Sequence, residues 1–366
     1  MEGLYIHIPF CRKKCFYCSF NVAINHEHHA EDYVRGLCSE MNFYQGRAIN
    51  SIYFGGGSPS RLNAKQFSLL MDSTRKKFCV DNASEVTVEI NPEDADASLL
   101  KVYRDCGVNR LSIGIQTFQD RYLKFLGRCH DSEQAVRVYD RARQAGFDNI
   151  NIDLMCGFPG QTPEDLGGDL EELKKLSCEH VSVYLLTIEE GSRFFVDRVP
   201  LPEKKAAAEQ YLFTVDRLRR MGFEHYEVSN FAKSGRRSSH NLNYWRCGHY
   251  IGLGAGAHSH ENGRRWWNVS RVKAYIEKAG RGESPEEGAE CLTVRQRIGE
   301  ALAFGLRMIE GIRIDDVEKS VGSVLSFQND AIMELIDNGF LEQSNGFLKV
   351  TTKGLLVLDD LALKLL

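Results

Sequence analysis

Short apolar segments, several of them rich in β-branched residues, alternate along the chain with longer segments of amphipathic helical periodicity. The short segments predict strands at residues 4–8, 51–54, 86–90, 110–115, 150–154 and 180–186. The longer segments predict helices that include residues 33–44, 64–77, 97–106, 132–145 and 163–176. Six βα units in series predict an α/β fold, in which a parallel sheet curls into a partial (βα)6 TIM-like barrel with its helices outside. Functional groups are then expected on the loops after the strands, at the carboxyl edge of the sheet.

The last quarter of the chain has a different pattern. Residues 264–290 are rich in Arg, Gly and Glu and predict a connector. Helical periodicity follows over residues 292–308, 315–321 and 323–338, before a strand pair around residues 340–342 and 347–350 and a final helix from near Thr352. Asn345-Gly346 between the two strands is a hairpin turn signal. We therefore expect a barrel domain at residues 1–265, a connector at 266–290 and a winged-helix-like α+β domain at 291–366.

Composition and charge narrow the class of protein. The 366 residues are 43% hydrophobic and 26% charged, as in an ordinary globular protein, and carry a net charge of −4. No apolar run is long enough to span a bilayer, and no signal peptide pattern precedes the first strand. Eleven scattered cysteines do not resemble a disulfide framework and indicate reduced thiols in a cytoplasmic protein. Winged helices often bind DNA, but we expect no nucleic acid partner because this region is rich in acids: Glu310, Asp315, Asp316, Glu318, Glu334 and Asp337.

Three of the cysteines form a compact motif shortly after the first predicted strand. Cys11, Cys15 and Cys18 are separated by gaps of three and two residues, so one tight loop can bring their thiolates to a single iron–sulfur cube. Three cysteines leave one of the four irons of a [4Fe-4S] cube free to bind a small molecule. Structural zinc is the alternative, but it needs four ligands, usually in two short pairs, and the chain has no second Cys-x-x-Cys pair. A histidine such as His7 would have to supply the fourth zinc ligand.

A glycine triplet follows the second predicted strand, in Gly55-Gly56-Gly57-Ser58. Three residues without a Cβ atom allow the backbone to approach a ligand closely and to offer its own hydrogen-bonding groups. On its own, such a triplet is more typical of a tight turn. Its position after a strand, in a chain with the cysteine motif, favours a ligand-binding segment.

Four polar residues follow or interrupt later predicted strands: Glu89, Gln116, Arg128 and Asp153. Glu89 and Asp153 interrupt apolar strands, where a carboxylate without a partner would cost several kcal/mol. They could form ion pairs at the strand ends, or they could receive their partners from a ligand. A ligand with hydroxyl groups, a positive charge and a carboxylate would suit all four residues, because the Arg128 fork matches a carboxylate.

The spacing Cys-x3-Cys-x2-Cys, with Tyr17 before the third cysteine, resembles that of radical S-adenosylmethionine (SAM) enzymes. The frame Tyr5-Ile6-His7-Ile8-Pro9-Phe10-Cys11 further resembles the oxygen-independent coproporphyrinogen III oxidase family, which includes a branch of HemW-type heme chaperones. The resemblance covers nearly the whole chain. It implies a [4Fe-4S] cluster on Cys11, Cys15 and Cys18, and reductive cleavage of SAM with an electron from an external donor. The SAM contacts that it implies are Tyr5, Tyr17, Gly56, Gly57, Ser58, Glu89, Gln116, Arg128, Asp153 and Thr187. Ser58 stands where the family usually has threonine, and the hydroxyl is kept.

Two features of the sequence distinguish the oxidase branch of this family from the heme chaperone branch. The oxidase branch carries a further cysteine two residues after Cys18, whereas this chain has Phe20. The string His-Asn-x-x-Tyr-Trp, present here as residues 240–245, is typical of the heme chaperone branch. A heme site needs an axial donor and flat apolar walls. The heme-binding candidates are therefore His240, Asn241, Tyr244, Trp245 and His258. From residue type alone, the aromatic pair could instead plug an incomplete barrel.

The resemblance therefore implies a radical SAM protein that acts as a heme chaperone, binding heme and delivering it to hemoproteins of respiration. Its expected partners are heme or a porphyrin, an electron donor, and a heme-acceptor protein, with peripheral contact to membrane hemoproteins. The alternative is an enzyme, oxygen-independent coproporphyrinogen III oxidase, which converts coproporphyrinogen III to protoporphyrinogen IX. Phe20 argues against that reaction. A radical methylase shares the same core and is a third alternative.

Overall fold

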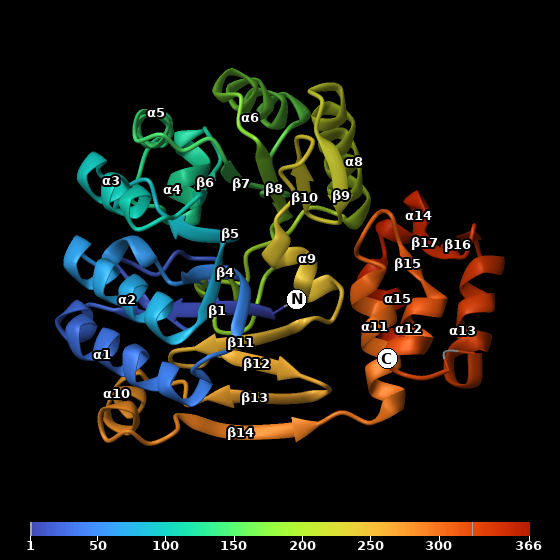
Figure 1. Cartoon of the computed structure of the whole chain (residues 1–366). Helices are drawn as coiled ribbons and strands as arrows, with labels where there is room; N and C mark the ends of the chain where they lie inside the picture. The colour runs from blue at the N-terminus through green and yellow to red at the C-terminus, as the bar shows by residue number, and fades with distance from the viewer. Residues whose placement is uncertain (1, 324) are drawn as a thin grey trace.

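The computed structural model describes residues 2–323 and 325–366, which form a large barrel-like unit and a smaller C-terminal unit (Figure 1). Met1 and Val324 lie outside the described residues, and Val324 belongs to the helix predicted at residues 323–338. Within the described residues, no helix combines the length and the apolar character needed to cross a membrane.

Six parallel strands in chain order form the centre of the large unit. They are β1 (Glu2–Ile8), β4 (Ala48–Gly56), β5 (Cys79–Ile90), β6 (Arg110–Gln116), β7 (Ile150–Cys156) and β8 (His180–Leu185). Each strand pairs in parallel with the next. The predicted α/β fold with a parallel sheet is therefore confirmed. A short parallel pair, β2 (Phe10–Cys11) and β3 (Ala23–Ile24), flanks the cysteine loop.

Helices cover the outer face of these strands (Figure 1). They are α1 (Ala30–Glu40), α2 (Ala64–Lys77), α3 (Ala97–Asp105), α4 (Asp120–Leu126), α5 (Ser132–Gln144), α6 (Pro163–Leu176) and α8 (Lys204–Arg220). The short helix α7 (Arg193–Val196) packs instead against the cysteine loop. Asn63, Asp131 and Thr162 each begin a helix with a reciprocal capping box, which satisfies backbone N–H groups of the first turn. The helix predicted at residues 33–44 ends earlier, because a 3-10 turn, η2 (Met41–Tyr44), follows α1.

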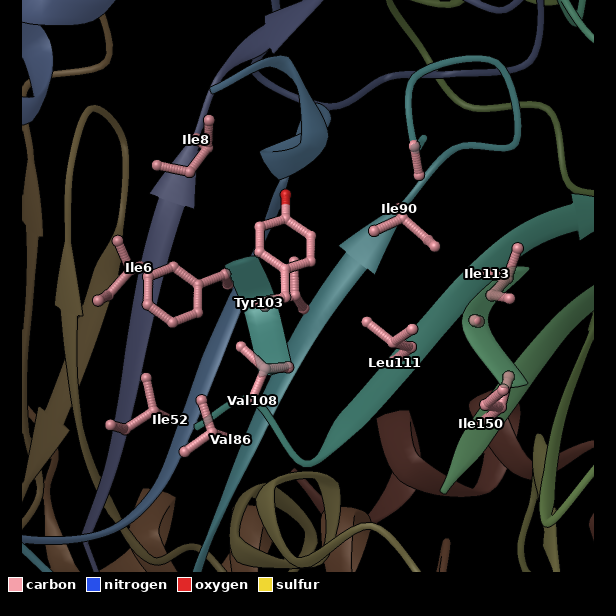
Figure 2. Close-up of a cluster of buried hydrophobic side chains, with 14 of the residues drawn as sticks. Ile6, Ile8, Ile52, Val86, Ile90, Tyr103, Val108, Leu111, Ile113 and Ile150 are labelled. Atoms are coloured by element: carbon pink, nitrogen blue, oxygen red, sulfur yellow. The ribbon is translucent and has the colours of Figure 1, made fainter. Parts of the chain in front are cut away.

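Apolar side chains between the sheet and the helices form the main core. Figure 2 shows Ile6, Ile52, Val86 and Ile113 from successive strands, together with Tyr103 of α3. All are buried, since strands covered by helices leave no outer face for water. This packing fixes the order of the strands and hence the loops that meet at their carboxyl ends.

Further strands extend the sheet on both sides; β11 joins β1 in parallel, and the other added pairs are antiparallel. On one side β8 is followed by β10 (Asn230–Ala232) and β9 (Glu224–Glu227). On the other, β1 pairs with β11 (His249–Leu253), which continues to β12 (His258–Glu261), β13 (Arg264–Asn268) and β14 (Glu286–Cys291). Within the part of the chain that the structure describes, the sheet therefore has twelve strands.

The prediction of a connector over residues 266–290 is wrong. This segment contains most of β13, the helix α10 (Val272–Gly280) and nearly all of β14, and α10 packs against α1. Its acids Glu286 and Glu290 form cross-strand ion pairs with Arg264 and Arg265, at 2.6 Å and 3.6 Å, on a solvated sheet. The segment was predicted to be a connector because its composition is highly charged, but these charges are paired between neighbouring strands.

The C-terminal unit has the order of elements of a winged helix, as predicted. Its elements are α11 (Val294–Gly305), β15 (Ile312–Arg313), α12 (Ile314–Ser320), α13 (Leu325–Asp337), β16 (Leu341–Ser344), β17 (Phe347–Val350), α14 (Thr352–Leu355) and α15 (Leu358–Leu365). Asn345 and Gly346 both have positive φ, at 53° and 79°, as a two-residue hairpin requires. The unit has its own apolar core, which also includes Tyr226 and Leu242 of the large unit.

Candidate functional site

A cavity of about 370 Å³ opens at the carboxyl edge of the parallel strands and extends down between them. The cysteine loop, the glycine segment and the ends of later strands form its walls. The predicted cluster and SAM residues that line it are Cys11, Cys15, Tyr17, Cys18, Gly56, Gly57, Ser58, Glu89, Gln116, Arg128, Asp153 and Thr187. The parallel sheet thus brings together residues that are up to 176 positions apart (187 minus 11).

The cysteine loop is docked on the end of α4 through Phe16. The Phe16 backbone N–H donates to the carbonyl of Leu126 at 2.9 Å. Its ring lies against Gly127, whose φ of 74° is left-handed and where a Cβ atom would come within 2.9 Å of that ring. The Arg193 guanidinium lies over the Phe16 ring, 4.4 Å from the ring centroid. Phe16 therefore anchors the cysteine loop both to the end of α4 and to Arg193, and these contacts restrain the positions of the thiols.

Their surroundings make the thiols of Cys11 and Cys18 less acidic. Burial, followed by the neighbouring Cys18 and Cys15, raises the pKa of Cys11 to about 12, and burial raises the pKa of Cys18. Thiols in such a site lose their protons when a metal centre replaces them. Among the described residues, no group of three or more His, Cys, Asp or Glu side chains is arranged to hold one metal ion. A cube does not need such convergence, because each thiolate binds a different iron. This donor set could hold an iron–sulfur cube with one free corner.

Arg128 connects the cysteine loop to the sheet. Its Nη1 donates to Cys15 Sγ at 3.4 Å, and its Nη2 donates to Asn91 Oδ1 at 2.6 Å and to the Gly114 carbonyl at 2.8 Å. Glu93 Oε2 lies 3.9 Å from Nη2. The side chain is 5% exposed, and its Nε is buried without a partner among the described residues. Arg128 lines the cavity, so a ligand carboxylate could accept from its guanidinium.

The glycine segment is packed against the strand that carries the cysteine loop. A Cβ atom on Gly57 would lie 2.7 Å from the Pro9 carbonyl carbon, and one on Gly56 would overlap the His7 ring. The Gly57 N–H donates to the Ile8 carbonyl at 2.8 Å. The glycines were predicted to allow close approach of a ligand. They do line the cavity, but their missing side chains make room first for the cysteine strand.

Ser58 is buried at the edge of this segment. Its hydroxyl lies 2.8 Å from that of Ser60 and donates to Asp94 Oδ2 at 3.4 Å. Asp94 in turn forms ion pairs with Arg12 and Arg61, each at 3.0 Å. The hydroxyl that replaces the family's threonine is therefore part of a network that also reaches the cysteine loop through Arg12.

Glu89 and Asp153 face the cavity from two strands, and among the described residues neither lies within ion-pair distance of a cation. Glu89 accepts from the Tyr53 hydroxyl at 2.7 Å and from the Gly56 N–H at 3.3 Å. Asp153 accepts from Ser112 at 3.0 Å and from Asn151 at 2.8 Å. Burial raises the pKa of Glu89 to about 7, and it raises the pKa of Asp153. The ion-paired alternative is thus wrong, and both acids retain acceptor capacity for ligand hydroxyls.

Two features of this cavity could not be foreseen from the chain. Gln116 ends β6 with a φ of 71°, which is uncommon for a residue with a side chain, and the pairing with β7 shifts register there. Arg110 lines the floor of the cavity at 1% exposure, and its Nε has no partner among the described residues. The only signal for Arg110 was a cation at the start of an apolar strand.

Tyr5 is placed differently from the prediction. Within the described chain it is not part of the cavity wall, and its hydroxyl lies 3.0 Å from His7 Nδ1. His7 Nε2 in turn donates to the Asn21 carbonyl at 2.9 Å. A direct contact between Tyr5 and a ligand of the cavity is therefore not supported by the structure.

The predicted heme ligands do not come together. His240 lies in α9 (Ser239–Trp245), at the end of the barrel opposite the cysteines, against Gly3 and Ser51 near the starts of β1 and β4. Its Nδ1 lies 2.9 Å from Ser51 Oγ and its Nε2 lies 3.0 Å from the Tyr244 hydroxyl. Burial lowers the pKa of His240 to about 3. Both ring nitrogens are used, so in this arrangement His240 has none free for a heme iron, and with Tyr244 it plugs the barrel.

The other heme candidates face different surroundings. Asn241 lines the cavity described above. Trp245 lines a second cavity, toward the C-terminal unit. His258 is exposed and stacks on Trp267, its cross-strand neighbour, with ring centroids 5.8 Å apart.

Residues 5–173 match the model of the Radical SAM superfamily, and residues 292–357 match that of the HemN C-terminal domain. The chain is 35% identical over 367 residues to the heme chaperone HemW of Bacillus subtilis, covering 98% of this chain and 97% of that protein. The chain belongs to the HemW family. The HemW of Escherichia coli is 40% identical over 70% of this chain and 69% of its own length.

Relatives and fold agree with this membership. The mitochondrial radical S-adenosyl methionine domain-containing protein 1 of Bos taurus is 32% identical over 100% of this chain and 87% of its own length. The coproporphyrinogen III oxidase (HemN) of Escherichia coli, a radical SAM enzyme, superposes with a TM-score of 0.87 over 100% of this chain and 89% of that chain, at 24% identity. That likeness establishes the fold. Radical SAM membership itself implies a [4Fe-4S] cluster and SAM.

Proposed function

We propose that this protein is a radical SAM heme chaperone, which binds heme and delivers it to hemoproteins of respiration. The observation that carries the proposal is the 35% identity to a HemW heme chaperone over almost the full length of both chains. Phe20 supports it, because this exposed side chain lines the cavity at the position where the oxidase branch has a cysteine. Delivery requires a heme-acceptor protein, with peripheral contact where that acceptor is a membrane hemoprotein.

In this proposal the first cavity is the cofactor site. Cys11, Cys15 and Cys18 hold the [4Fe-4S] cluster, and SAM lies between the glycine segment and the later strand ends. The bound cluster and SAM supply one-electron redox chemistry, and an external donor supplies the electron. Arg128 orients the cysteine loop and donates to the carboxylate of SAM. Glu89 and Asp153 accept from ribose hydroxyls, which favours their charged forms.

The remaining SAM contacts follow from the same cavity wall. Gly56 and Gly57 offer carbonyl oxygens to the amino group of SAM, since the Gly57 N–H is already used in the fold. Tyr17, Ser58, Gln116 and Thr187 complete the surroundings. We also propose a cytoplasmic location, because all eleven cysteines are free thiols, which suits a reducing compartment.

A comparison of two reactions tests the function. The reconstituted protein is incubated without oxygen with SAM, a reductant and coproporphyrinogen III, and separately titrated with heme. We expect a heme Soret band that saturates, and no release of carbon dioxide or protoporphyrinogen IX. Formation of protoporphyrinogen IX would show that the protein is an oxidase. Failure of the protein to bind heme would refute the proposed chaperone function.

A matched pair of cysteine variants tests the cluster site. Cys15→Ala is expected to lose iron and sulfide, whereas Cys79→Ala, at an exposed cysteine on β5, is expected to retain both. Equal iron content in the two variants would contradict the assignment, and zinc in the wild-type protein would refute the cluster.

A further inference from the structure

A second cavity, of about 610 Å³, lies between the large unit and the C-terminal unit. The end of α9 and the strands β11 and β12 form one wall, and α11, α12 and β15 form the other. Small-molecule sites in proteins have volumes of about 300–1,000 Å³. The apolar part of the lining is Trp245, Leu292, Ala301, Met308, Ile312, Val317, Val321 and Phe347.

We infer that this interdomain cavity is the heme site, with His260 as the axial ligand and Arg297 as the partner of a heme carboxylate. The inference rests on the proposed chaperone function and gives that function a location. It differs from the expectation based on the His-Asn-x-x-Tyr-Trp string, in which His240 was the ligand. In the structure that string contributes Trp245 to the cavity, whereas His240 lies inside the barrel.

His260 is prepared to bind a metal through one nitrogen. Its Nδ1 lies 3.3 Å from the Gly248 carbonyl oxygen, which can only accept, so Nδ1 carries the hydrogen. Nε2 then carries a lone pair, and no hydrogen bond to it is found within the described residues. A backbone carbonyl that fixes the tautomer is the usual support of a metal-bound histidine. Burial lowers the pKa of His260, which keeps the ring neutral near pH 7.

The aromatic wall suits a flat ligand. Trp245 lies in the lining, and the Arg307 guanidinium stands 4.7 Å from the centroid of its ring. Its Nε1 is buried and has no partner among the described residues. A tetrapyrrole offers Trp245 and the apolar residues of the lining a broad apolar face.

Arg297 is the arginine of the lining that has no carboxylate partner in the described structure. Its one hydrogen bond is a contact of 3.5 Å to the Ser320 carbonyl. By contrast, Arg246 pairs with Glu310 at 3.4 Å, and Arg313 pairs with Asp315 at 3.5 Å.

The acids that line the cavity are already engaged. Glu310 also pairs with Arg237 at 3.0 Å, Glu300 pairs with Arg265, and Asp316 lies 3.9 Å from Lys319. Among the described residues of the lining, a ligand carboxylate therefore finds one arginine, Arg297, whose charge is not already balanced by a carboxylate.

The test uses the full chain and compares His260→Ala with His258→Ala. The two histidines lie on the same strand and the same face, but His258 is outside the cavity. Heme is titrated into each variant, and the axial ligand is identified by electron paramagnetic resonance. We expect His260→Ala to bind heme about tenfold or more weakly and to lose the histidine-ligated spectrum. Added imidazole should restore the spectrum, and His258→Ala should resemble the wild-type protein.

Arg297→Ala gives an independent test. It should weaken heme binding without changing the axial spectrum, and it should not weaken binding of a heme whose carboxylates are esterified. A wild-type protein that binds heme while His260→Ala keeps the same affinity and spectrum would overturn this inference and leave the chaperone function intact. A thiolate-ligated spectrum lost in Cys247→Ala would also overturn it. A wild-type protein that does not bind heme would instead refute the proposed function.

Discussion

The guanidinium of Arg128 donates a hydrogen bond to the sulfur of Cys15, across 113 positions of the chain, with Nη1 and Sγ 3.4 Å apart. The same side chain donates to Asn91 and to the Gly114 carbonyl, so it links the cysteine loop to two strand ends. The position of the cysteines therefore depends on the sheet and not on the loop alone. With the cluster bound as proposed, this charged donor beside Cys15 would favour the reduced cluster, since hydrogen bonds to cluster sulfurs influence the reduction potential.

Replacement of Arg128 by alanine should destabilise the protein and the cluster site. The acceptors that it leaves unpaired are expected to lower the free energy of unfolding by about 1.5–3 kcal/mol. Chemical denaturation measures this loss, and iron analysis with electron paramagnetic resonance measures cluster loading and the response to SAM. Arg128→Lys should restore the positive charge but not the planar guanidinium that donates to several acceptors at once, so it should recover only part of the loss. Arg121→Ala, at an exposed arginine of α4, is the control and should change stability by less than about 1 kcal/mol. Equal behaviour of Arg121→Ala and Arg128→Ala would contradict the role of Arg128.

Addition of one methyl group at Gly57 should displace the cysteine strand. The new Cβ atom would lie 2.7 Å from the Pro9 carbonyl carbon, so backbone must move. We expect Gly57→Ala to lose about 1–3 kcal/mol of stability and to retain less iron than the wild-type protein. Gly168→Ala is the control, because this glycine is exposed in α6 with open space around it. It should stabilise the helix by about 0.5–1 kcal/mol and leave the iron content unchanged.

The protonation of Glu89 should make stability depend on pH. Its pKa is raised to about 7 in the folded protein, mainly by burial, so its contribution to stability is present below the unfolded pKa of about 4.5 and is lost as the pH rises through 7. Glu89→Gln keeps an acceptor but does not titrate. The free energy of unfolding of the cluster-free wild-type protein should therefore fall by about 1–3 kcal/mol more than that of Glu89→Gln between pH 4.5 and 8. Parallel pH profiles of the two proteins would show that Glu89 has an ordinary pKa.

Replacement of His240 should affect stability and not heme binding. His240→Ala removes two buried hydrogen bonds and leaves a cavity beside Tyr53, so we expect a loss of about 2–4 kcal/mol. His258→Ala should change stability by less than about 0.5 kcal/mol. Heme affinity is measured below the unfolding temperature of each variant. A folded His240→Ala protein that no longer binds heme would restore His240 as the ligand.

The sequence alone determined those features that depend on local motifs and on the periodicity of apolar residues. Alternating apolar segments placed the six parallel strands, and the parallel connections then required polar residues as distant as Ser58, Glu89 and Asp153 to meet at one edge. The cysteine motif was visible because Cys11, Cys15 and Cys18 lie within one short loop. The hairpin at Asn345-Gly346 was visible because that turn requires two residues with positive φ.

Only the tertiary structure decided which contacts each side chain makes. A histidine in a sequence string can be a ligand or a buried hydrogen-bonding group, and packing against Ser51 and Tyr244 places His240 in the second class. The strands of residues 264–291 were missed because their charges are balanced across strands, and pairing partners do not appear in a local pattern. The left-handed Gln116 and the buried Arg110 were equally hidden, since neither backbone strain nor burial is a property of residue type. The interdomain cavity exists because the surfaces of two units meet, and the periodicity of one segment carries no information about which surface it will face.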